Sequence, residues 1–156
     1  MRAGALAPEW LKPVGDSLSA HDGRGLFIVL FPAYRPDLVK ALAHHFDLEF
    51  FDFRVQVMAK LGTDAGTLEL DALERSMISR TQHRGIALMN AEALLAVKPS
   101  EARKSWLRRA LGLSLPCPAV IPLAIFADDA PIDDPRVVGL TVEALPEQSL
   151  IGRLAN

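Results

Sequence analysis

The first residues with chemical potential lie in a turn that follows an apolar run. The stretch LFIVLFPAYRPDLVKAL, residues 26–42, predicts a strand, a short turn and an amphipathic helix. Backbone N–H groups at the start of such a helix can cradle a phosphate. A phosphate loop of the GxxxxGKS or GxxxxGKT type needs glycines for that wrapping and a lysine for the terminal phosphates. The turn FPAYRPDL has neither.

Two residues at the start of this helix further oppose an anion. Pro36 removes one of the N–H donors of the first turn, and Asp37 places a carboxylate at the positive end of the helix dipole. Arg35 remains as a candidate nucleotide contact. Tyr34 beside it is expected to be exposed and to serve as an anchor for a protein partner. The bland alternative is a well-capped helix without a ligand, and we favour it.

A second candidate lies in GIALMNAEALLA, residues 85–96. An ATPase uses an aspartate at the end of such an apolar strand to hold Mg²⁺. Here Met89 or Asn90 stands at that place, and neither supplies the charged oxygen that Mg²⁺ prefers. Asn90 is kept as a nucleotide contact, and Glu92 as a base or water-positioning group. In the structural alternative, Asn90 caps the following helix and Glu92 interacts favourably with its dipole.

The segment 98–109 is basic, with a local charge of +4 from Lys98, Arg103, Lys104, Arg108 and Arg109 against Glu101. Helical spacing places Lys104, Arg108 and Arg109 on one side, away from Trp106 and its apolar neighbours. Arg103 falls on the apolar side, where it must reach solvent or find a partner. The basic face can contact DNA phosphates or an acidic protein surface, or it is simply a solvated face.

An acidic loop, DDAPIDDP at 128–135, follows the expected fourth strand. Asp128 and Asp129 are candidate ligands for a divalent cation, which prefers hard oxygen ligands. The spacing matches no calcium loop, however, and aspartate near proline is ordinary turn chemistry. The acidic loop can also dock on the basic segment of a second copy, which would make the protein a homo-oligomer.

The elements that must position these residues alternate along the chain. The predicted strands are 26–31, 48–53, 85–89, 119–126 and 136–142. The predicted helices are 8–20, one that begins at Pro36, 67–82, 100–112 and a short C-terminal helix. Such alternation implies right-handed crossovers, and hence an α/β three-layer sandwich with a mainly parallel five-stranded sheet. We expect a single domain over 1–156, with an N-terminal helical extension at 1–24 and a C-terminal helix or tail at 143–156.

Composition is consistent with a globular protein. The chain has 156 residues, of which 50% are hydrophobic and 23% are charged, and its net charge is −2. No global positive field therefore draws it to nucleic acid or membranes. Cys117 is the only cysteine, so no internal disulfide forms. We find neither a signal peptide nor an apolar run of spanning length, and we expect a cytoplasmic location without membrane contact.

The order of these elements, together with the LMNAEALL stretch, resembles a minimal P-loop NTPase core of the AAA/RecA-like kind. It is most similar to the small P-loop proteins of BREX-type phage-defence systems, over roughly residues 26–126. The resemblance implies a P-loop-like topology. Because the phosphate loop and the metal-holding aspartate are both missing, it implies a degenerate member that works by binding partners.

The sequence thus favours a catalytically degenerate accessory protein that binds other protein subunits of a complex, with phage defence as the implied setting. We expect no cofactor, and we lean against an enzyme. Two alternatives stay open. One is a small nucleotide-binding hydrolase or transferase with Arg35, Glu92 and Asp128 in its site. The other is a DNA-contacting module that uses the basic segment 98–109.

Overall fold

The fold is built on a parallel five-stranded sheet. The computed structural model describes residues 8–147. The strands are β1 (Gly25–Leu30), β2 (Glu49–Asp52), β3 (Ile86–Met89), β4 (Pro118–Leu123) and β5 (Val137–Gly139). Their order across the sheet is β2-β3-β4-β1-β5, and every pairing is parallel. The predicted α/β three-layer sandwich is confirmed.

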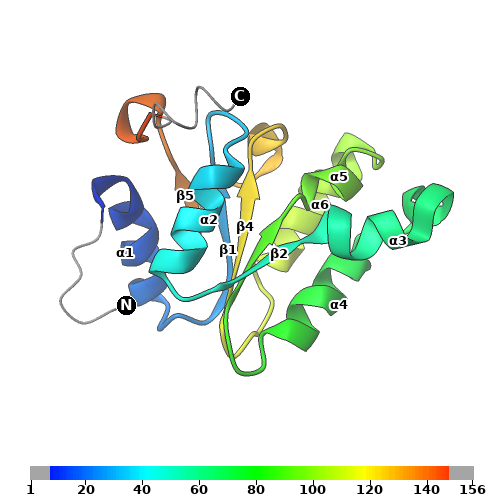
Figure 1. The fold of residues 1–156 in the computed structure, drawn as a ribbon, viewed down its shortest axis with the longest axis horizontal. Coiled ribbons are helices and arrows are strands. Elements are labelled where there is room, and N and C mark those ends of the chain that lie inside the picture. Colours follow the sequence, from blue (N-terminus) through cyan, green and yellow to red (C-terminus); the bar gives the residue numbers. More distant parts are fainter. Residues whose placement is uncertain (1–7, 148–156) are drawn as a thin grey trace.

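Helices cover both faces of this sheet (Figure 1). One face carries α1 (Lys12–Ala20), which follows the short helix η1 (Glu9–Leu11), and α2 (Pro36–His45). The other carries α4 (Asp71–Arg80), α5 (Glu92–Leu95) and α6 (Ser100–Ala110). Right-handed crossovers require this division. The chain moves across the sheet in one direction from β1 to β2, and in the opposite direction from β2 through β3 and β4 to β5. No helix within residues 8–147 combines the length and apolarity needed to cross a membrane.

Alternation along β1 builds a separate core on each face. Phe27 and Val29 pack with α1 and α2, whereas Leu26 and Ile28 pack with α4 to α6. Because successive side chains of a strand point to opposite faces, one continuous apolar run supplies both cores.

Several element boundaries differ from the prediction. The predicted strands 119–126 and 136–142 are shorter, since β4 ends at Leu123 and β5 covers only Val137–Gly139. The predicted helix 67–82 begins at Asp71 and ends at Arg80, and the predicted helix 100–112 ends at Ala110. Of the predicted C-terminal helix or tail at 143–156, the described part holds the end of a 3₁₀ turn, η5 (Val142–Ala144). The rest of the predicted terminal segments, 1–7 and 148–156, lies outside the described residues.

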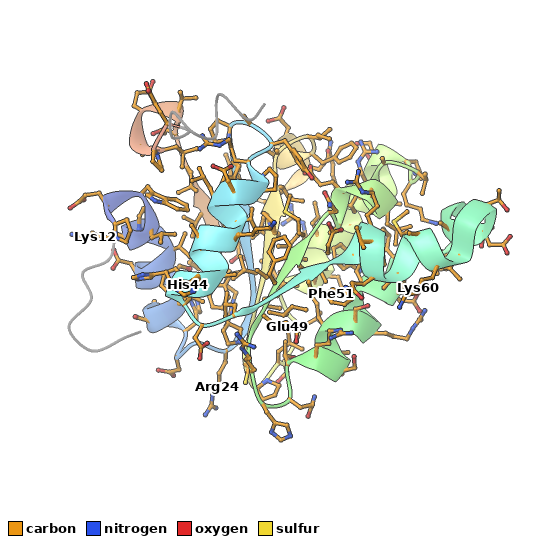
Figure 2. All side chains as sticks on the ribbon, viewed as in Figure 1. Lys12, Arg24, His44, Glu49, Phe51 and Lys60 are labelled. Atoms are coloured by element: carbon orange, nitrogen blue, oxygen red, sulfur yellow. The ribbon has the colours of Figure 1, made fainter. Side chains whose placement is uncertain are left out.

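An exposed arm follows β2, and the sequence did not predict it. It comprises a π-helix, η2 (Arg54–Met58), then α3 (Ala59–Leu61) and the 3₁₀ helix η3 (Gly62–Thr67). Figure 1 shows α3 projecting to one side of the sheet, and Figure 2 shows Lys60 on it. Val57 and Met58 pack partly against the core at the base of this arm.

The edge strand β2 carries a charged pair. Arg80 of α4 donates to Glu49 Oε1 at 2.9 Å, and its guanidinium lies 4.1 Å from the ring centre of Phe51. Glu49 and Phe51 are labelled in Figure 2. A charged side chain on an edge strand disfavours pairing with the strand of another chain.

Gly85, just before β3, allows the backbone there to pack closely against Leu48 and Pro118. A Cβ at this position would lie 2.5 Å from Leu48 Cδ2 and 2.8 Å from the carbonyl oxygen of Pro118. We expect Gly85→Ala to lower the free energy of unfolding by about 1–3 kcal/mol, as overpacking does. Denaturant titration measures it, with Gly66→Ala as the matched control because nothing lies within 4 Å of a Cβ there. Equal stability of the two variants would contradict the expectation.

Candidate functional site at the carboxyl edge of the sheet

The carboxyl ends of parallel strands, where connections diverge to opposite faces, are the usual ligand site of such folds. Here β1 leads to α2 on one face, whereas β4 leads to Phe126 and η4 (Ala127–Asp129), which pack toward the other face. The crevice between the ends of β1 and β4 is therefore the expected ligand site.

Asp37 already occupies the anion position at the start of α2. Its carboxylate accepts bonds from Arg35 Nε at 3.0 Å and Arg35 Nη2 at 2.9 Å. The hydrogen bond from Arg35 lowers the pKa of the Asp37 carboxyl below its usual value, so the carboxylate stays ionised and its charge is balanced by that of Arg35. Arg35 Nη2 also donates to the carbonyl oxygen of Pro146 at 3.0 Å. The one cation and the one carboxylate at the start of this helix are thus already paired with each other.

The crevice beneath this turn is almost filled. The cavity bordered by Phe31, Tyr34 and Leu123 measures about 10 Å³. A cavity needs roughly 10–15 Å³ to hold one water molecule, whereas small-molecule pockets measure roughly 300–1,000 Å³. This cavity is therefore far smaller than a small-molecule pocket.

Polar side chains join the ends of three strands. Tyr34 Oη donates to Asn90 Oδ1 at 3.1 Å, and Asn90 Nδ2 donates to both carboxylate oxygens of Asp52 at 3.0 Å. Asn90 is buried and adopts a left-handed backbone conformation with a φ of 63°. Its side chain does not cap α5, whose N-cap position is Ala91, so that part of the structural alternative is wrong. Sequence analysis missed Asp52, although its place at the end of a predicted strand was a usable signal.

Glu92 holds the segment that follows β4. Its side chain is only 9% exposed. Oε1 accepts the backbone N–H of Ala124 at 2.9 Å, and Oε2 accepts that of Phe126 at 2.6 Å. Because these N–H groups bond to a side chain rather than to a neighbouring strand, β4 ends at Leu123. Glu92 does lie in the first turn of α5, as expected.

The acidic loop pairs with the basic segment inside one chain. Arg103 Nε donates to Asp129 Oδ2 at 2.7 Å, Arg103 Nη1 donates to the carbonyl oxygen of Lys98 at 2.7 Å, and the guanidinium lies 4.3 Å from the ring centre of Phe126. The partner that Arg103 was expected to need is therefore Asp129. Asp128 is exposed. Over residues 8–147, no three His, Cys, Asp or Glu side chains gather as a metal site would require.

The faces of α6 are arranged as predicted. Trp106 and Leu107 are buried, and Lys104, Arg108 and Arg109 are exposed. Arg109 Nη2 donates to Glu74 Oε1 at 3.0 Å, and the same oxygen accepts Trp106 Nε1 at 2.9 Å. Lys104 and Arg108 therefore supply most of the charge that this face presents to solvent.

Large apolar side chains are exposed shortly after four of the strands. Tyr34 follows β1, Val55 follows β2, Ile125 follows β4 and Val142 follows β5. Their exposed fractions are 50%, 54%, 73% and 68%, respectively. In Figure 1 the segments after β1, β4 and β5 lie together at one end of the sheet.

The carboxyl edge therefore combines a filled crevice, carboxylates that already have protein partners and exposed apolar side chains. Comparison of the chain with protein-family models, with curated proteins and with solved structures found no match.

Proposed function

We propose that this chain is a catalytically degenerate, P-loop-like accessory protein that binds another protein subunit through the carboxyl edge of its sheet. The observation that carries the proposal is the exposure of Tyr34, Ile125 and Val142 at an edge whose crevice measures only about 10 Å³. The resemblance of the LMNAEALL stretch to BREX-type small P-loop proteins extends the proposal to a cytoplasmic phage-defence complex.

The contact between Tyr34 and Asn90 supports the P-loop-like part of this proposal. Tyr34 lies in the turn compared with a phosphate loop, and Asn90 lies where a metal-holding aspartate was sought. The two side chains meet at 3.1 Å. In an active enzyme these two positions would jointly hold phosphate and Mg²⁺. Here uncharged side chains fill the same place and bond to each other.

The exposed apolar side chains support the docking part. Aromatic residues are enriched at protein interfaces, where a few of them carry most of the binding energy. Glu92 and Arg103 hold the backbone near Ile125 through contacts at Phe126 and Asp129. A preorganised surface loses less conformational entropy on binding than a mobile one. The hydrolase alternative is the weaker one, because Arg35 is already paired with Asp37 and Glu92 is already bonded to two backbone N–H groups.

The exposed face of α6 favours a second candidate, contact with nucleic acid. Lys104 and Arg108 lie one helical turn apart on it. Binding through these residues would weaken steeply with salt. Heparin or duplex DNA retention that is lost in Lys104→Glu plus Arg108→Glu, and kept in Lys40→Glu, would support this candidate.

The docking proposal is tested by purifying the tagged full chain from its native cells. We expect a stoichiometric partner that Ile125→Asp releases and that Ile78→Asp retains, because Ile78 is exposed on α4, away from this edge. Equal retention by both variants would overturn the proposed surface.

Nucleotide binding is tested separately by thermal unfolding. Millimolar ATP with Mg²⁺ is expected to leave the Tm unchanged within about 1 °C, since a ligand raises the Tm only when it binds the folded state. A rise of several degrees that Arg35→Ala abolishes would instead favour the hydrolase alternative.

A further inference from the structure

A second cavity lies at the opposite, amino edge of the sheet. It measures about 480 Å³, within the range of small-molecule sites. It lies between α1, the turn that joins α2 to β2, and the start of β4, and its apolar lining residues are Leu11, Gly15, Leu18, Phe46, Leu48 and Pro118. We propose that this amino-edge groove binds a small amphiphilic cation, an apolar body that carries an ammonium or guanidinium group. The proposal is independent of the docking function.

Gly15 forms part of the wall of the groove. It lies in the middle of α1, where glycine costs about 1 kcal/mol of helix stability relative to alanine. A Cβ at Gly15 would lie 3.5 Å from Phe46 Cε1, an ordinary contact, so no clash forces the choice of glycine. Its spacing from Leu11 and Leu18 places all three on one side of the helix. Because a Cβ at position 15 would already touch Phe46, a longer side chain would have to extend into the groove or displace that ring.

The charges on the rim indicate which ligands the groove prefers. Asp16, Ser19 and Asp22 line it along and just beyond α1, against the single ammonium group of Lys12. Asp22 lies next to the C-terminal end of α1, where the helix dipole also favours a cation. Lys12 lies at the other end of the helix, and Figure 2 shows it there. Neither Asp16 nor Asp22 forms a salt bridge with another residue in the range 8–147.

The wall of the groove suits the rest of such a ligand. Phe46 and Pro118 are half-buried and offer an apolar surface to the body of the molecule, whereas Leu11, Leu18 and Leu48 are buried behind it. The ring of Phe46 offers an aromatic surface, and a cation over the face of such a ring gains further attraction. A simple anion would meet two carboxylates and one ammonium group, so the same groove disfavours it.

The test compares three probes of similar length and different charge. The full chain is titrated with 3-phenylpropylamine, 3-phenylpropanol and 3-phenylpropionate, and amide shifts are followed by NMR. We expect saturable shifts at Gly15, Ser19 and Gly23 with the amine. The propionate should bind about tenfold more weakly, a difference of about 1.4 kcal/mol, because the two rim carboxylates attract the ammonium group and repel the carboxylate group of the probe.

Variants locate the binding. Asp16→Asn with Asp22→Asn should abolish the preference for the amine over the alcohol, whereas Asp133→Asn, on the exposed acidic loop, should retain it. Gly15→Met should weaken all three probes, and Gly15→Ala should keep the fold while narrowing the groove. Absence of saturable shifts, equal affinity for amine and propionate, or an amine preference that survives the double aspartate variant would each overturn the proposal.

Discussion

Glu92→Ala is expected to lower the free energy of unfolding by about 3–5 kcal/mol, because two hydrogen bonds to a charged group are lost and each is worth about 1.5–3 kcal/mol. Both carboxylate oxygens accept backbone N–H groups, from Ala124 at 2.9 Å and from Phe126 at 2.6 Å. Glu92 is 9% exposed, so water replaces these acceptors poorly. Denaturant titration measures the loss.

Conservative variants test whether Glu92 stabilises the fold by accepting the N–H groups of Ala124 and Phe126, which we call its bracing role. Glu92→Gln keeps the size of the side chain but turns an NH₂ group toward one of the two donors, so we expect an intermediate loss of stability. Hydrogen exchange at the Ala124 and Phe126 amides should accelerate in both variants. Glu101→Gln, on the exposed side of α6, is the control and should remain within about 0.5 kcal/mol of the parent. If Glu92→Gln retained full stability and exchange protection, the bracing role would be wrong.

The sequence was sufficient to predict the architecture, because the signal for it is local. The continuous apolar run that ends at Phe31 and the amphipathic helix after Pro36 each follow from short-range periodicity. Alternation of such segments then leaves few topologies open. The apolar side of α6, with Trp106 and Leu107 buried, was predictable for the same reason.

The site was less predictable, because its contacts join residues that lie far apart in the chain. Glu92 bonds to backbone groups 32 and 34 residues away, and no side-chain pattern announces a backbone partner. The same contacts occupy the backbone N–H groups just after Leu123, where β4 ends. The predicted end of this strand and the predicted role of Glu92 were therefore wrong for the same reason. Arg103 was recognised as needing a partner, but either the acidic loop or a second copy could have supplied it.

The arm after β2 was missed for another reason. Val55 and Val57 are β-branched residues that favour strands, yet they form a π-helix on the surface. Asp52 accepts the backbone N–H of Val55 at 3.2 Å, which turns the chain out of the strand. Asp52 lies beside Asn90 for a different reason, because it pairs with Met89 in the register of β2 and β3.

The pair Arg103–Asp129 should be strongly coupled. The side chains are 17% and 10% exposed, and the two atoms lie 2.7 Å apart. Breaking such a pair leaves one charge with little water and no partner. We expect Arg103→Met and Asp129→Leu each to lower the free energy of unfolding by about 2–4 kcal/mol, as removal of one partner of a largely buried ion pair does.

The double variant distinguishes pairing from loss of packing. Because an apolar pair of similar volume carries no desolvation penalty, Arg103→Met with Asp129→Leu should regain much of the stability lost by each single variant. The exposed pair Arg75–Asp71, with side chains 66% and 54% exposed, gives the reference cycle. Its coupling should be about 0.3–0.5 kcal/mol. A coupling for Arg103–Asp129 no larger than this reference would show that the acidic loop is held by packing of Phe126 and Ala130 rather than by charge. The docking surface around Ile125 would then depend on Glu92 and these apolar contacts.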